Sequence, residues 1–185
     1  MAEFAGDYDL QYVHIYNHRG EGLKVDQAGN RQDARGENIS NMVVELNIYE
    51  SLYNHAITGS LVIADTKNLI SNLPIQGTER LSFRLATKLD SYSHESSIDF
   101  SEETGVPLQI YKLDKVTRDP TNDKGQFYQI FFCSPEMFRS ATTKISRAYK
   151  GPIEQAIFDI VRNKLKSKKP FFFEPTATNA KYVIP

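Results

Sequence analysis

The histidines are the first residues to test for chemistry, because neutral imidazole is a common metal ligand. The chain has four, and His14 and His18 are four residues apart, with His55 and His94 elsewhere. On a helix that spacing would place two rings on one face, as in zinc sites. Here His14 lies in a predicted strand and His18 in the loop after it, and no cysteine or acid completes a ligand set. We therefore expect no metal site and interpret these histidines as surface or interface residues.

Two other residue types could carry catalysis. Cys133 is the only cysteine, so no intramolecular disulfide can form, and its apolar surroundings favour a small buried residue over a nucleophile. Glu102 and Glu103 are adjacent in a serine-rich stretch. A general acid and base need a rigid cleft in which the two carboxyls have different environments, so we expect these two to be solvated.

Anion-binding motifs are equally sparse. Neither Gly20–Gly22 nor Gly77–Glu79 leads from a strand into a helix, as a phosphate or dinucleotide site requires, and no serine nucleophile elbow occurs. The lysines of Lys164–Lys169 could contact a phosphate backbone. Because the net charge is only −1 and no aromatic residues are interleaved with these lysines, a solvated helix end is favoured. The sequence therefore predicts no enzyme and no cofactor.

The elements that must position these residues are mainly strands. Alternation of apolar and polar residues predicts half-buried antiparallel strands at Met42–Tyr49, Ala56–Ile63 and Arg80–Leu85. In the first strand, one face is expected to carry Met42, Val44, Leu46 and Ile48. Further strands are predicted at Asp9–Tyr16, Leu108–Thr117 and Gln126–Cys133.

Helices are expected to be few. One turn is predicted within Lys67–Leu73, and a short helix with Ser134 as its N-cap and Pro135 at N1. An amphipathic helix is predicted over about residues 152–167. Its apolar face would consist of Ile153, Ala156, Ile157, Ile160, Val161 and Leu165. The predicted fold class is mainly β with minor α (α+β), with an antiparallel, barrel-like sheet.

The domain organisation follows from composition. Residues 1–8 are predicted to be a loose terminus, residues 9–150 a β-rich domain, and residues 151–185 a helix with the start of a following domain. Such a chain would be the front part of a longer protein. Long loops are expected at 20–38 and 90–107.

The 90–107 loop is acidic and contains no Lys or Arg. A partner-contact arm and a floppy insertion are both open for it, and its possible anchors are Tyr92, Ile98 and Phe100. No apolar run reaches the roughly 20 residues needed to span a bilayer, so no stable membrane binding is expected.

The order of elements resembles the N-terminal tube domain of the baseplate hub subunit of contractile-tailed, T-even-like bacteriophages. The likeness covers most of residues 39–185, although the two long loops exceed what that family has, and a second tube domain and spike-binding elements are missing. The motifs that carry it are, in order, Glu50–Tyr53, Gly59–Leu61, Asp65–Leu69, Gly77–Glu79, Ile110–Leu113, Tyr149–Pro152 and Tyr182–Pro185.

This resemblance implies a non-enzymatic, structural role in the virion, at the tail baseplate, after synthesis in the host bacterial cytoplasm. Hub subunits of this kind form a homotrimeric ring. The ring joins the tail tube protein to the central spike protein, contacts other baseplate proteins and lets DNA pass in transit. Ring neighbours would cover sheet edges that are a liability in a monomer.

Other functions stay open from the sequence. One is a tail tube or tail-completion protein, or a tube or hub component of a related contractile injection system. A less favoured one is a hub fused to a peptidoglycan hydrolase, whose catalytic domain would lie beyond Pro185. The candidate partner contacts are Tyr53, His55, Tyr92, Ile98 and Phe100.

Overall fold

A computed structural model of the chain describes residues 8–17, 19, 38–66, 69–72, 75–87, 97–101, 104, 106–118, 125–170, 172–176 and 180–184. The chain forms two compact units, Met1–Ser134 and Pro135–Pro185, which are treated separately below. Strands make up 48% of the described residues and the helices are short, so the fold is mainly β with minor α, as predicted.

Within its described residues, the first unit is a seven-stranded antiparallel sheet in the order β1-β4-β6-β7-β3-β2, with β5 paired to β4. The 3₁₀ turn Ser40–Met42 precedes β2, and helix α1 (Leu69–Asn72) follows β3. All six predicted strands and the predicted helical turn are present. The strands are β1 (Tyr8–Tyr16), β2 (Val43–Tyr49), β3 (Thr58–Asp65), β4 (Arg80–Thr87), β5 (Ser97–Asp99), β6 (Leu108–Arg118) and β7 (Gln126–Cys133).

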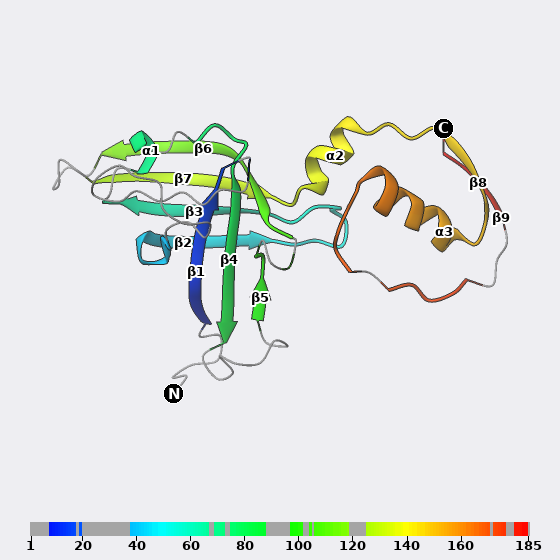
Figure 1. Cartoon of the computed structure of the whole chain (residues 1–185), viewed down its shortest axis with the longest axis horizontal. Helices are drawn as coiled ribbons and strands as arrows, with labels where there is room; N and C mark the ends of the chain where they lie inside the picture. Colours follow the sequence, from blue (N-terminus) through cyan, green and yellow to red (C-terminus); the bar gives the residue numbers. More distant parts are fainter. Residues whose placement is uncertain are drawn as a thin grey trace. The chain divides into compact units, whose positions relative to one another are not determined.

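The sheet curls into a half-barrel at the contact between β4 and β6. Strand β4 pairs with β1 over its whole length, but with β6 through only two residue pairs, Arg80↔Gln109 and Leu81↔Leu108. Figure 1 shows β1 and β4 running across β6, β7, β3 and β2 rather than alongside them. The two parts of the sheet therefore face each other as in an orthogonal packing, with the core between them.

Inward-facing side chains from both parts fill this core. Three aromatic rings connect the parts, because the ring of Phe83 lies 5.8 Å from that of Phe132 and 5.1 Å from that of Phe100, between centroids. Full burial of each such side chain stabilises the fold by about 1.5–3 kcal/mol. The fully buried apolar residues include Val13, Leu61, Ile63, Leu81, Phe83, Leu108, Ile110, Ile130 and Phe132.

Strand β2 departs from its predicted alternation. A β-bulge lies between Val43 and Glu45, and a bulge adds one residue to its strand, which reverses the faces on either side of it. As a result Val43 packs against the core while Val44 is 62% exposed. Met42 is buried, but in the 3₁₀ turn rather than in the strand. The prediction that Val44 shares a face with Leu46 and Ile48 was wrong, because those two residues pack against the core.

Part of the expected 90–107 loop belongs to the sheet. Ser97–Asp99 forms β5, with Asp99 opposite Arg84 on β4. The Tyr12 hydroxyl donates to Asp99 Oδ1 at 3.1 Å, and burial together with this carboxylate raises the pKa of Tyr12 to about 12. Phe100 follows directly and is 92% buried in the core, where its amide donates to the Phe83 carbonyl. Tyr92 and most of the predicted 20–38 loop lie outside the described residues.

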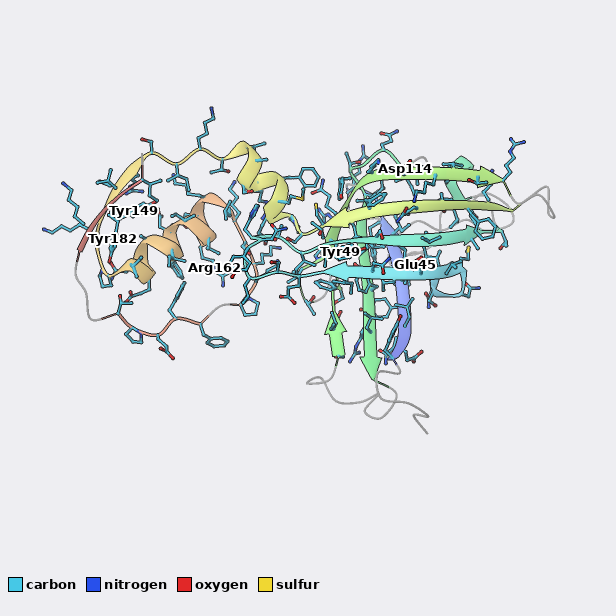
Figure 2. All side chains as sticks on the ribbon, turned by 180° about the vertical axis from the view of Figure 1, so that it is seen from behind. Glu45, Tyr49, Asp114, Tyr149, Arg162 and Tyr182 are labelled. Atoms are coloured by element: carbon cyan, nitrogen blue, oxygen red, sulfur yellow. The ribbon has the colours of Figure 1, made fainter. Side chains whose placement is uncertain are left out.

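The second unit contains α2 (Glu136–Thr142), β8 (Arg147–Gly151), α3 (Ile153–Phe158), a π-helical continuation (Asp159–Lys164) and β9 (Ala180–Ile184). Strands β8 and β9 pair antiparallel, which places Tyr149 opposite Tyr182 (Figure 2). The unit begins at Pro135, whereas the sequence placed a boundary at 150/151, and β8 belongs to it through its pairing with β9. Gly151, with φ of 125°, makes the bend from β8 into α3.

Both predicted helices of this unit are present, with two differences. Ser134 does not cap α2, since Pro135 occupies the N-cap position without a side-chain capping bond. The longer helix changes from α to π geometry after Phe158, and of its predicted apolar face only Ala156 is buried.

Substitution of Gly59 on β3 by a larger residue tests the core packing directly. A Cβ atom at this position would overlap the Asn47 carbonyl oxygen of β2 and the ring of Phe132 on β7. We expect Gly59→Ala to lower the free energy of unfolding by about 1–3 kcal/mol or more, and Gly59→Val to prevent folding. Urea unfolding followed by circular dichroism measures this. Thr58→Val, one residue earlier in β3, is the control; equal stability of the Gly59 variants and this control would contradict the packing described.

Candidate interaction surface

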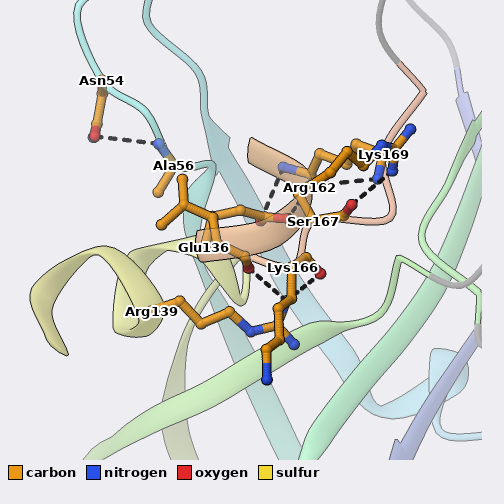
Figure 3. Close-up of polar contacts among 9 residues, drawn as sticks. Asn54, Ala56, Glu136, Arg139, Arg162, Lys166, Ser167 and Lys169 are labelled. Atoms are coloured by element: carbon orange, nitrogen blue, oxygen red, sulfur yellow. Dashed lines mark hydrogen bonds and ion pairs between the residues drawn. The ribbon is translucent and has the colours of Figure 1, made fainter. Parts of the chain in front are cut away.

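The turn between β2 and β3 has a defined shape. The Asn54 amide donates to the Ser51 carbonyl at 3.2 Å, and the Tyr53 amide donates to Ser51 Oγ at 3.2 Å. The Asn54 side chain accepts from the Ala56 amide at 3.4 Å (Figure 3). Serine and asparagine side chains that bond nearby amides in this way are typical of tight turns. The turn therefore gives the intervening residues a fixed direction.

Those intervening residues are apolar and protrude into solvent. Leu52 and Tyr53 are fully exposed, and Tyr49 at the end of β2 is 60% exposed. Apolar side chains that an ordered turn keeps in water are typical of interaction sites. Strand β2 is also the last strand of the sheet order, so among the described residues its outer edge has no neighbouring strand. We use the term hairpin surface for the exposed residues Val44, Glu45, Tyr49, Glu50, Leu52 and Tyr53.

The hairpin surface is acidic at its margins. Between Asn38 and Thr66 the sequence contains no Lys or Arg, whereas Glu45 and Glu50 are both exposed. Figure 2 shows Glu45 and Tyr49 on β2. The Glu45 carboxylate accepts from the Asn47 side chain at 2.6 Å, which fixes its position on the strand. An apolar centre with a charged rim is the usual composition of a protein–protein interface.

The candidate contacts from the sequence fall into different environments. Tyr53 and His55 are exposed in or beside the turn, so the structure brings these two together. Ile98 is half-exposed on β5, a strand that pairs with β4 and not with β2. The Phe100 ring is buried in the chain's own core and is not at the surface, and Tyr92 lies outside the described residues. Sequence reasoning missed Leu52 and Tyr49, although an apolar residue beside a turn was the available signal.

The Gly77–Glu79 segment turned out to contain an amide nest. The Glu79 carboxylate is buried and accepts from the amides of Gln76, Gly77 and Thr78 at 2.8–3.1 Å. Gly77 has φ of 89°, which allows these amides to converge. Such nests bind anions, and here the chain's own carboxylate occupies it. The Glu79 carbonyl accepts from the Ile110 amide at 2.9 Å, so the nest lies at the corner where β4 meets β6.

Glu79 therefore stabilises the corner of the half-barrel. We expect Glu79→Ala to lower the free energy of unfolding by about 1–3 kcal/mol, because three amides lose their acceptor. Glu79→Gln keeps one acceptor oxygen and should lose less. Thermal unfolding of both variants beside wild type tests this order. Equal losses in the two variants would mean that the side-chain volume, and not the acceptor, is what matters.

In the second unit, a cluster of polar side chains binds the backbone carbonyls at the C-terminal end of the helix. Arg139 Nη1 donates to the carbonyls of Leu165 and Lys166 at 3.0 and 2.7 Å, and Arg162 Nη1 donates to the Ser167 carbonyl at 2.6 Å. The Ser167 hydroxyl donates to Glu136 Oε1 at 2.7 Å (Figure 3). Lys169 Nζ lies 3.3 Å from the other Glu136 oxygen. Cations at carbonyls of a helix C-terminus are stabilising, so three of the basic groups here have a structural role.

Asp159 joins β8 to the helix within the same unit. Its carboxylate accepts from Asn163 at 2.7 Å and from the Tyr149 hydroxyl at 3.0 Å, and Arg147 lies 3.5 Å away. The hydrogen bond from Asn163, followed by that from Tyr149, lowers the pKa of Asp159. A lowered pKa means that the ionised carboxylate stabilises this contact above the ordinary Asp range, and that the stabilisation is lost as pH falls through the folded-state pKa.

Low pH should therefore weaken the contact between β8 and the helix that Asp159 makes. We expect hydrogen exchange of the Arg147–Gly151 amides, corrected for its intrinsic pH dependence, to become faster below about pH 4. Asp159→Asn should show the faster exchange already at neutral pH and lose the acid step. Glu174→Gln, an exposed acid in the same unit, is the control. A wild-type acid step that persists in Asp159→Asn would assign the effect to another carboxyl.

No family model matches this sequence, and no curated protein matches it. In the part of the chain that the structure describes, no helix combines the length and apolarity needed to cross a membrane. Across the same residues, no three His, Cys, Asp or Glu side chains are grouped so that they could bind a metal ion. The hairpin surface is accordingly the feature on which we base a function.

Proposed function

We propose that this chain is a structural subunit of a contractile-tail baseplate, a hub-type tube domain that assembles into a ring. The ring would join the tail tube to the central spike and let DNA pass through its channel. The observation that carries this proposal is the hairpin surface, where an ordered turn presents Leu52 and Tyr53 to solvent beside the open edge of β2.

A curled sheet with an open edge favours assembly on physical grounds. Unpaired strand edges invite pairing with other chains, and closed cyclic symmetry limits that pairing to a finite ring. Burial of exposed apolar surface stabilises such a contact by about 25 cal/mol per Å². The half-barrel belongs to the mainly β fold class that the resemblance implies.

Two segments that carry the resemblance coincide with distinctive local structure. Glu50–Tyr53 forms the exposed turn, and Gly77–Glu79 forms the amide nest at the corner of the half-barrel. One segment thus lies where a ring neighbour would bind, and the other where the sheet bends.

Replacement of the two protruding residues tests the proposal. Wild-type protein should form particles of defined mass that bind purified contractile tail tubes, and the mass separates a trimeric hub from a hexameric tube protein. Leu52→Ser with Tyr53→Ser should abolish both assembly and tube binding, because the apolar centre of the contact is removed, while the melting temperature stays unchanged. Light scattering coupled to size exclusion and co-sedimentation with tubes measure these effects.

The control is Val116→Ser, which removes an exposed apolar side chain, 54% accessible, from β6. It should assemble and bind tubes as wild type does. Wild-type protein that neither assembles nor binds tubes at any concentration would contradict the proposal.

A further inference from the structure

The net charge of −1 is the sum of large, opposite net charges on the two units. Residues 1–134 contain nineteen Asp and Glu against twelve Lys and Arg, whereas residues 135–185 contain four against ten. The first unit therefore has a net charge of −7 and the second a net charge of +6. Opposite charges on the two units favour contacts between the acidic unit of one molecule and the basic unit of another.

The second unit also leaves apolar side chains uncovered. Among its described residues Ala156 is the one apolar side chain that is buried, while Ile153, Ile157 and Phe158 are 37%, 39% and 51% exposed. Ile153 and Ile157 are four residues apart in α3 and so lie on one face of it. This face is part of the predicted amphipathic stripe, of which Ile153 and Ile157 are the exposed residues, while Ala156 is buried and Ile160, Val161 and Leu165 are partly buried.

Exposed lysines follow this stripe directly. Lys164, Lys166 and Lys168 are exposed, while Arg139 and Arg162 are engaged with backbone carbonyls. We use the term helix surface for Ile153, Ile157, Phe158, Lys164, Lys166 and Lys168. It combines exposed apolar side chains with exposed lysines that follow them along the chain, and the hairpin surface combines exposed apolar side chains with exposed acids.

We infer that the helix surface of one copy of this chain binds the hairpin surface of the next copy, head to tail. The inference rests on the proposed ring and names the surfaces that would form it. Contacts between two different surfaces close into a ring when the rotation between copies allows it. Apolar residues would supply the affinity, and the lysines opposite Glu45 and Glu50 would set the register and speed of association.

The composition of both surfaces favours a second copy over a nucleic acid. Phosphate groups would pair with the lysines but would leave Ile153 and Ile157 in water. The acids of the hairpin surface would repel phosphate groups, so a nucleic acid would leave that surface uncovered as well. A second copy satisfies the charges and the apolar side chains of both surfaces at once.

Charge reversal tests the inference. Glu45→Lys with Glu50→Lys, and separately Lys164→Glu with Lys168→Glu, should each weaken self-association by about tenfold or more at low salt. The fourfold variant that carries both pairs should regain wild-type association, because every contact is then reversed but complementary. Sedimentation velocity over a range of protein and salt concentrations measures the association. Asp9→Lys and Lys181→Glu, exposed charges outside both surfaces, are the controls and should behave as wild type does.

Several results would overturn the inference. They are a fourfold variant that stays dissociated while its circular dichroism is native, charge variants that associate normally, and a monomer at every concentration. Binding of a 30-nucleotide DNA that is lost in the lysine variant, without any self-association, would assign the helix surface to a polyanion instead. If copies associate as expected but bind no tail tube, the proposed function fails while this inference stands.

Discussion

The ring of Phe132 lies against the backbone of Gly59, and the curl of the sheet depends on this contact. Phe132 reaches Phe83 on β4, and Phe83 in turn reaches Phe100, so one row of aromatic side chains connects β3 to the other part of the sheet. Only two residue pairs join β4 to β6. Side-chain packing, and not the hydrogen-bond ladder, therefore keeps the two parts of the half-barrel together.

Two buried carboxylates also stabilise the fold, because they accept hydrogen bonds from backbone amides. Glu79 satisfies three amides at the corner, and Asp65 accepts from the Ile70 amide at 3.4 Å where β3 ends and α1 begins. Burial, followed by the Asp65 carboxylate nearby, raises the pKa of the Tyr128 phenol, which keeps its proton inside the core. Buried charge is costly unless it is hydrogen-bonded, so both acids lie where backbone amides would otherwise lack acceptors.

These constraints also determine what is left on the outside. The bulge in β2 turns Val44 outward, and the Ser51 and Asn54 bonds direct Leu52 and Tyr53 away from the core. The helix in the second unit has its C-terminal carbonyls satisfied by Arg139 and Arg162, which leaves the neighbouring lysines at the surface. Two surfaces of opposite charge and similar apolar content result. The assembly that we propose follows from this division.

The sequence by itself determined the strands, because alternation of apolar residues is a local signal that burial of one face imposes on every half-exposed strand. It also indicated the short helix α2 after Ser134, although not its cap. Only the tertiary structure decided the bulge in β2, the pairing of Ser97–Asp99 with β4 and the burial of Phe100, since these depend on partners distant along the chain. The same holds for the hairpin surface. The sequence indicated Tyr53 as a contact but not Leu52, which looks like a core residue by type, and the exposure of both follows from a turn whose direction is set by hydrogen bonds and by the sheet behind it.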